Sequence, residues 1–148
     1  MKIVLYQPQI PQNTGNIVRT CSVTGCDLLL VRPLGFSTSS RMLKRAGLDY
    51  WDEVDITYTH DLTEYLAGVD APFFFFSSKA KRLYSETTYP KDCILIFGSE
   101  STGLPQLFWD KWPEKFLTLP MKSDSRCLNL SNTVSIIIYE AWKQQGFQ

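Results

Sequence analysis

Apolar residues occur along this chain in short runs, with polar stretches between them. Runs that are apolar throughout indicate strands buried on both faces, as in a parallel sheet. The segment 55–59 predicts a strand at an edge of the sheet. Strands of the fully buried kind are predicted at 2–6, 27–33, 71–78, 92–99 and 115–121.

Short helices are predicted between the strands from their start and stop signals. Gly25 is the residue type favoured just after a last helical turn. Asp61, with Glu64 three residues later, has the spacing of a helix N-cap. The segment 7–16 is rich in Pro, Asn and Gly and predicts a loop. The helices are expected within 16–25, 39–47, 61–68 and 101–112.

The last predicted helix runs from about Asn132 to Gln145 and is apolar on more than one side. Ile136 and Tyr139 fall outside its main apolar stripe. One side can therefore cover the sheet while the other needs a partner, which predicts a homodimer with residues 133–142 in the interface. The stripe has helical spacing and consists of Val134, Ile137, Ile138, Ala141 and Trp142.

Strands that alternate with helices predict an α/β fold with a mainly parallel sheet sandwiched by helices. The 148 residues suffice for one domain with a sizeable core. Ligands in such sheets bind beyond the carboxyl ends of the strands. This rule selects four loops rich in Gly, Ser, Asn or Lys, at 7–16, 77–82, 98–105 and 121–132.

The charges balance, with 15 Lys and Arg against 15 Asp and Glu. A nucleic acid would therefore have to bind through local basic patches. The alternative for each patch is ordinary surface charge. The candidate patches are Arg41 with Lys44 and Arg45, then Lys79 with Lys81 and Arg82, then Lys122 with Arg126.

Several common classes of protein are excluded by what the sequence lacks. The four cysteines form no CxxC pair and there is one histidine, His60, so a zinc cluster is not expected. The first residues do not have the pattern of a signal peptide, and no apolar run reaches the length of a membrane span. We therefore expect reduced thiols, a cytoplasmic protein and neither membrane nor metal.

Familiar nucleotide and hydrolase motifs are also missing. Residues 98–103 have the glycine spacing of a phosphate loop, but Leu104 and Pro105 stand where that loop needs Lys and Ser or Thr. The sequence contains neither GxGxxG after a strand nor GxSxG. Binding of ATP or NAD, and a hydrolase triad, are therefore not expected.

Three segments together resemble RNA methyltransferases of the SPOUT class. They are "NTGNIVRTC" (13–21), "LIFGSESTGLP" (95–105) and "SRCLNLSNTVSIIIYEAW" (125–142). "YQPQIPQNTGN" (6–16) and "LKRAGLDYW" (43–51) are similar to the single-domain tRNA 2′-O-methyltransferases that act on the wobble nucleotide. The resemblance covers essentially the whole chain, 1–148, as one methyltransferase domain.

The resemblance implies a deep C-terminal trefoil knot that holds S-adenosylmethionine, in a homodimer that binds the tRNA anticodon loop. The loop 121–129 would thread through another loop, and its polar residues would form hydrogen bonds with buried backbone groups. Asn129 and Ser131 would cap the last helix. The target would be the ribose 2′-hydroxyl of a wobble cytidine or modified uridine. Alternatives are another RNA, such as rRNA, and a knotted RNA-binding dimer without activity.

Catalysis by this class is an attack of the ribose hydroxyl on a sulfonium methyl, which requires positioning and removal of a proton. A guanidinium is protonated at ordinary pH, so Arg19 is expected to orient the ribose and an adjacent phosphate. It would accept the proton only in a strongly perturbed environment, and the sequence does not identify the general base. Glu100 would brace the region of Arg19 or loops of the other subunit. The catalytic positions implied by the resemblance are Asn13, Arg19, Glu100 and Asn129.

The cofactor would be held mainly by backbone groups. Gly98 and Gly103 would allow close backbone approach, with an ordinary turn as the alternative for Gly103. Cys127 stands where the family commonly has serine, which matters only if that hydroxyl is used. The alternative for the apolar positions is core packing. The cofactor positions are Phe76, Gly98, Leu119, Cys127, Leu128 and Asn129.

Overall fold

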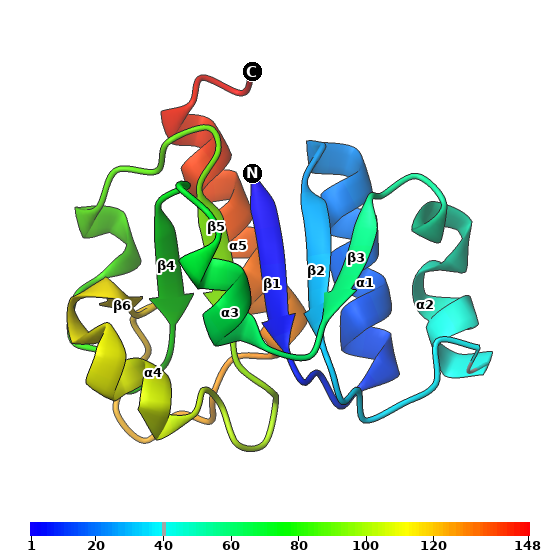
Figure 1. The fold of residues 1–148 in the computed structure, drawn as a ribbon, viewed down its shortest axis with the longest axis horizontal. Coiled ribbons are helices and arrows are strands. Elements are labelled where there is room, and N and C mark those ends of the chain that lie inside the picture. The colour runs from blue at the N-terminus through cyan, green and yellow to red at the C-terminus, as the bar shows by residue number, and fades with distance from the viewer. Residues whose placement is uncertain (40) are drawn as a thin grey trace.

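The six strands of the described chain form one parallel sheet in the order β3-β2-β1-β5-β4-β6 (Figure 1). The computed structural model describes residues 1–39 and 41–148, except the side chains of 42, 44 and 46–48. The parallel sheet and the edge position of 55–59 are thus confirmed. The strands are β1 (Lys2–Tyr6), β2 (Asp27–Val31), β3 (Ile56–Thr59), β4 (Phe73–Phe76), β5 (Ile94–Phe97) and β6 (Phe116–Leu117).

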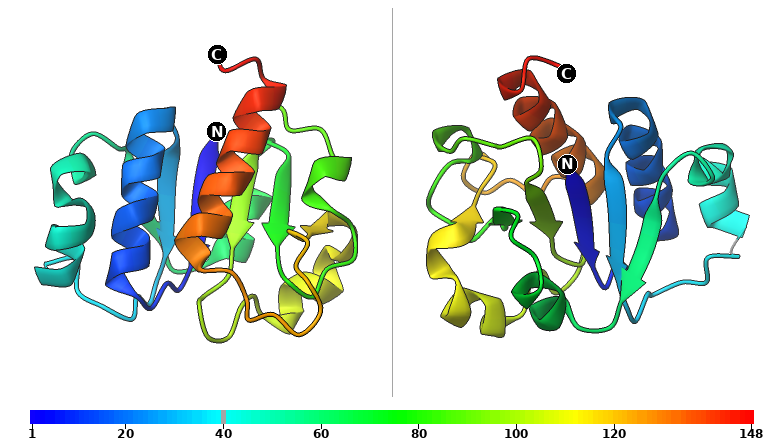
Figure 2. Two further views of the ribbon diagram at one scale, coloured as in Figure 1. Left: turned by 180° about the vertical axis from the view of Figure 1, so that it is seen from behind. Right: turned by 45° about the horizontal axis from the view of Figure 1, so that its top comes forward.

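Helices lie on both faces of the sheet, which gives the predicted layers. α1 and α5 cover one face, α3 and α4 cover the other, and α2 lies beside α1 (Figures 1 and 2). No helix of the described residues is long and apolar enough to cross a membrane. The helices are α1 (Pro11–Thr24), α2 (Arg41–Trp51), α3 (Leu62–Ala67), α4 (Gln106–Lys111) and α5 (Leu130–Gln144), with short 3-10 turns η1 (Tyr84–Glu86) and η2 (Pro113–Lys115).

The core has two halves, one on each face of the sheet. Ile3 and Leu5 of β1 pack with Ile17 of α1 and Ile137 of α5, whereas Val4 packs on the other face among residues of α3 and α4. Successive residues of a strand point to opposite faces. A strand covered on both faces must therefore be apolar throughout, which is why the apolar runs predicted these strands.

The apolar stripe of α5 is largely confirmed. Its members Val134, Ile137, Ile138 and Ala141 have no exposed surface, and Trp142 is half-buried. Ile136 is 39% exposed and Tyr139 is 46% exposed, so the helix does have a second apolar side. α5 also begins two residues earlier than predicted, because Asn129 caps it.

The predicted loop 7–16 is partly wrong, because α1 begins at Pro11. Proline is favoured in the first turn of a helix, where its missing N–H costs nothing. Asn13 is consequently a buried helical residue instead of a loop residue. The caps at the other predicted positions are confirmed. Gly25 ends α1 with φ 69°, and the N–H of Glu64 donates to Asp61 Oδ1 at 3.0 Å.

Two other predicted ends lie several residues from the observed ones. The helix expected to stop at Gly47 continues to Trp51, whose ring packs with Tyr50 against the core. The strand expected over 115–121 leaves the sheet after Leu117. The next residue, Thr118, pairs with the segment after β4, where its N–H donates to the carbonyl oxygen of Arg82 at 2.8 Å.

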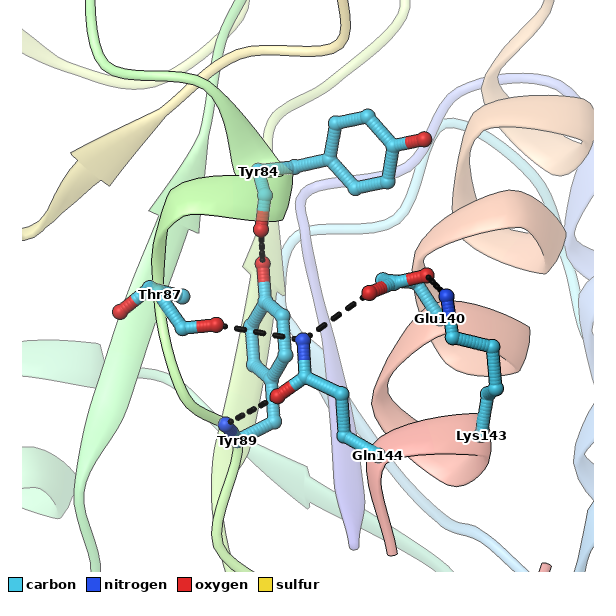
Figure 3. Close-up of polar contacts among 6 residues, drawn as sticks. All are labelled: Tyr84, Thr87, Tyr89, Glu140, Lys143 and Gln144. Carbon is cyan, nitrogen blue, oxygen red and sulfur yellow. Dashed lines mark hydrogen bonds and ion pairs between the residues drawn. The ribbon is translucent and has the colours of Figure 1, made fainter. Parts of the chain in front are cut away.

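The last turns of α5 hold the segment that leads into β5. Gln144 Nε2 donates to the carbonyl oxygen of Thr87 at 3.2 Å, and the N–H of Tyr89 donates to Gln144 Oε1 at 3.1 Å (Figure 3). The buried Tyr89 hydroxyl donates to the carbonyl oxygen of Tyr84 at 2.6 Å. Segment 84–90 is thereby fixed to a helix that lies far away in the sequence.

Candidate active site

A cavity of about 490 Å³ lies beyond the carboxyl ends of β4 and β5, against the first turn of α5. Its walls come from the loops after these strands, 77–79 and 98–104, and from 119–130. This is the place at which a parallel sheet binds ligands, and the volume falls within the range of small-molecule sites.

The cavity brings together every residue that was expected to bind the cofactor. Leu104, Trp109 and Met121 extend the apolar lining, and Ser77, Ser78 and other hydroxyls supply polar groups. The part that each residue plays in binding remains a prediction. The expected residues that line the cavity are Phe76, Gly98, Leu119, Cys127, Leu128 and Asn129.

Gly98 is required by the close approach of two backbone segments at the cavity wall. A Cβ on Gly98 would lie 2.4 Å from the carbonyl carbon of Gly103, a distance that real Cβ atoms do not adopt. Gly103 itself has φ +65°, a left-handed conformation that favours glycine. Ser99 and Gly103 hold the loop closed, with the N–H of Gly103 donating to the carbonyl oxygen of Ser99 at 3.0 Å.

The Glu100 carboxylate binds the start of α1. Oε2 accepts from the N–H of Gln9 at 2.8 Å, and Oε1 accepts from the N–H of Ile10 at 3.0 Å. Oε1 also accepts from Nδ2 of Asn13 at 3.3 Å. Gln9 and Ile10 directly precede α1 and Asn13 lies in its first turn, so this carboxylate stabilises the beginning of α1.

Asn13 continues this chain of hydrogen bonds to the last helix. Its Oδ1 accepts from Nδ2 of Asn129 at 2.9 Å. Oδ1 of Asn129 accepts from the N–H of Ser131 at 2.9 Å and from the Ser131 hydroxyl at 2.7 Å, which caps α5 as predicted. Glu100, Asn13 and Asn129 therefore connect the three segments that carried the family resemblance.

Arg19 lies apart from this group. It is exposed on α1, does not line the cavity, and its guanidinium carbon lies 5.2 Å from the centre of the Tyr50 ring. Glu100 was expected to brace the region of Arg19, and the structure shows that it does not contact Arg19 itself. The carboxylate supports the helix that carries Arg19, through Gln9, Ile10 and Asn13.

Residues 121–129, whose backbone was expected to be buried, are all exposed in the single chain. Hydrogen bonds within the loop pair some of its backbone groups. For example, the N–H of Ser125 donates to the carbonyl oxygen of Lys122 at 3.2 Å. Cys127 is an exposed free thiol, 3.8 Å from the Ser78 hydroxyl. The residues of this loop are thus accessible to a ligand or a partner.

The other three cysteines are buried and free. Burial raises the pKa of Cys93 to about 11 and also raises the pKa of Cys21 and of Cys26. A thiol that stays protonated is a poor nucleophile.

No group of His, Cys, Asp and Glu among the described residues could hold a metal ion.

The basic patches are exposed wherever their side chains are described. Lys79 also lines the cavity, and Arg82 donates to Thr87 Oγ1 at 3.0 Å. The side chain of Lys44 lies outside the described residues.

Sequence reasoning missed the cavity residue Trp109, whose ring stacks on the ring of Phe116 with 3.6 Å between the ring centres. An apolar residue such as Trp109 in a short helix fits core packing as well as it fits a ligand site.

Residues 1–139 match the model of the SpoU rRNA Methylase family. The chain belongs to this family. The resemblance drawn from the three segments is confirmed, because relatives similar along nearly the whole chain carry the name tRNA (cytidine(34)-2′-O)-methyltransferase.

Among these relatives, a protein of Listeria monocytogenes is 50% identical over 149 residues, which cover 98% of this chain and 88% of that one. The tRNA (cytidine(34)-2′-O)-methyltransferase of Escherichia coli K12 is 42% identical over 149 residues, which cover 99% of this chain and 95% of that one. A solved structure described as giving insights into 2′-OH methylation of C/U34 on tRNA superimposes with a TM-score of 0.91 at 40% identity, over 99% of this chain and 97% of that one.

Proposed function

We propose that this protein transfers a methyl group from S-adenosylmethionine to the ribose 2′-hydroxyl of nucleotide 34 of tRNA, a cytidine or modified uridine, and does so as one domain over 1–148. The observation that carries the proposal is the meeting of three family segments at one cavity, through Glu100, Asn13 and Asn129. It is supported by 42% identity, along nearly the whole chain, to a tRNA (cytidine(34)-2′-O)-methyltransferase.

The residues of the cavity fit S-adenosylmethionine. Phe76, Leu119 and Leu128 offer apolar surface for an adenine ring, and the backbone of the exposed residues 127–129 would offer amides and carbonyls to its edge. The close approach of Gly98 to Gly103 leaves no side chain between that wall and a ligand. When bound, the cofactor supplies an activated methyl group. No metal is needed, since positioning and proton removal are the main demands.

Some residues of the chain would hold the helices in place, and others would contact the RNA. Asn13, Glu100 and Asn129 hold the starts of α1 and α5 at the cavity. Arg19 would orient the ribose and an adjacent phosphate through its planar fork of N–H donors. The exposed basic patches would bind the RNA backbone around a single-stranded anticodon loop, where splayed nucleotides leave a ribose accessible.

We also propose the trefoil knot. Contacts on both sides of loop 119–129 support it. Before the loop, Thr118 pairs with the segment 82–84. After it, Gln144 binds Thr87 and Tyr89 of the same stretch of chain (Figure 3). Chain segments that precede and follow the loop are therefore both attached to the connection between β4 and β5.

A homodimer in the cytoplasm completes the proposal. The exposed Ile136 and Tyr139 of α5 form an apolar surface that a second copy would cover. Arg19 lies outside the cavity of its own chain. This favours an active site in which one copy supplies the cofactor cavity and the other supplies Arg19. The proposed tRNA substrate supports a cytoplasmic location.

The rival substrate is ribosomal RNA, which the description of the family model favours. The test is methyl transfer from labelled S-adenosylmethionine to purified tRNA and purified rRNA, in parallel. The proposal predicts label in tRNA alone. Label in rRNA alone would favour the rival, and absence of transfer with retained cofactor binding would favour an RNA-binding dimer without activity.

A further inference from the structure

Within the part of the chain that the structure describes, Arg19 contacts an aromatic ring and forms no ion pair with a carboxylate. Its guanidinium carbon lies 5.2 Å from the centre of the Tyr50 ring. The ion pair found among the described residues joins Lys143 to Glu140, far from this place in the sequence. A guanidinium over a ring is attracted to the ring face while its N–H groups remain free. An ion pair would instead occupy those donors.

The ring itself is a fixed support. Tyr50 lies in α2, is half-buried, and packs together with Trp51 against the core cluster that includes residues of α1. A second contact lies close to Arg19, because the Ser22 hydroxyl of α1 donates to the carboxylate of Glu53, in the turn that follows α2. The exposed face of α1 is therefore attached to α2 at Arg19, and to the turn after α2 about one helical turn later.

We propose that Tyr50 is a positioning residue, which fixes the direction of the Arg19 guanidinium and leaves its N–H groups available to ribose and phosphate. This inference rests on the proposed function, in which Arg19 orients the substrate. An exposed arginine that moves freely would have to be ordered each time RNA binds, and ordering a long side chain is unfavourable. The ring lowers that cost before the substrate arrives.

The test compares Tyr50→Leu with Tyr50→Phe in methyl transfer to tRNA. We expect Tyr50→Leu to lower kcat about tenfold, which corresponds to about 1.4 kcal/mol, with the KM for S-adenosylmethionine unchanged. Tyr50→Phe keeps the ring and should retain nearly full activity. Tyr58→Leu is the matched control, because Tyr58 also lies under an arginine, Arg32, at 4.5 Å but on another element. It should behave as wild type.

A nuclear magnetic resonance measurement follows the arginine directly. The Nε–Hε signal of Arg19, identified by its loss in Arg19→Lys, should shift in Tyr50→Leu and stay nearly unchanged in Tyr50→Phe. If Tyr50→Leu does not fold, pentafluorophenylalanine at position 50 keeps the shape of a ring but removes the electron density that attracts a cation. The same fall in kcat is then expected.

Two results would overturn the inference: wild-type kcat in Tyr50→Leu, or an equal loss in Tyr50→Phe. Arg19→Ala, assayed beside them, separates this failure from a failure of the proposed function. An inactive Arg19→Ala with an active Tyr50→Leu rejects only the role of Tyr50. A fully active Arg19→Ala rejects the role of Arg19 itself.

Discussion

Oδ1 of Asn13 accepts a hydrogen bond from Nδ2 of Asn129 at 2.9 Å, which joins the start of the first helix to the start of the last. Asn129 also caps α5 through Ser131. Asn129→Ala should therefore lower the free energy of unfolding by about 1 kcal/mol and weaken S-adenosylmethionine binding. Denaturant unfolding and calorimetry measure the two effects. Asn132→Ala, at an exposed position in the first turn of α5, is the control and should change neither.

Glu100→Gln should loosen the start of α1. An amide has one oxygen where the carboxylate uses two to accept from Gln9, Ile10 and Asn13. We expect a loss of about 1–2 kcal/mol in the free energy of unfolding and faster hydrogen exchange at Gln9 and Ile10. Unchanged exchange at these amides would contradict the capping role. Glu114→Gln, an exposed carboxylate elsewhere, should have little effect.

Gly98→Ala should damage both the fold and the cavity. The new methyl group would meet the backbone of Gly103 at 2.4 Å, so the two segments must separate. We expect a destabilisation of about 1–3 kcal/mol and loss of cofactor binding. Gly68→Ala is the matched control, because its Cβ would lie 3.6 Å from the nearest atom, an ordinary contact. Equal stability of the two variants would argue against the close approach.

Ile136→Glu with Tyr139→Glu should convert a dimer into monomers. An obligate interface of this type buries upwards of roughly 2,000 Å², and two charges at its centre would be desolvated without partners. Sedimentation velocity at micromolar concentration gives the mass of each species. Leu107→Glu is the control, since Leu107 is 57% exposed on the distant helix α4. A monomeric wild-type protein would contradict the proposed assembly.

Cys127 should be the thiol that reacts with iodoacetamide in the folded protein. Burial raises the pKa of Cys93 to about 11, so at about pH 8 this thiol stays protonated, and the thiolate is the reactive form. Cys21 and Cys26 are buried and have raised pKa values as well. S-adenosylmethionine should slow the labelling of Cys127, which lines the cavity. Cys127→Ser should abolish labelling, and a second labelled cysteine would contradict the structure.

The strands could be predicted from local pattern, because each central strand is covered on both faces. The start of α1 has one local signal, Pro11 in the first turn, but the carboxylate that stabilises this start lies 90 residues further along the chain. The end of β6 depends on a similar long-range partner, since Thr118 leaves the sheet to pair with residues 82–84.

The cavity residues were named from the family resemblance, and periodicity alone did not distinguish Phe76 or Leu119 from core residues. The outward position of Arg19 also escaped prediction. It depends on how α2 packs beside α1, and the local sequence around Arg19 carries no signal for the Tyr50 ring.

The most direct test of the proposed function is nucleotide-resolved mapping of ribose methylation on total tRNA, treated with S-adenosylmethionine and either wild type or Arg19→Ala. Wild type should methylate the 2′-oxygen of nucleotide 34 and no other ribose. Arg19→Ala should leave that ribose unmodified while it still folds and binds cofactor, and Arg19→Lys should restore little, because an ammonium lacks the planar fork. Methylation at any other nucleotide, or full activity of Arg19→Ala, would contradict the account.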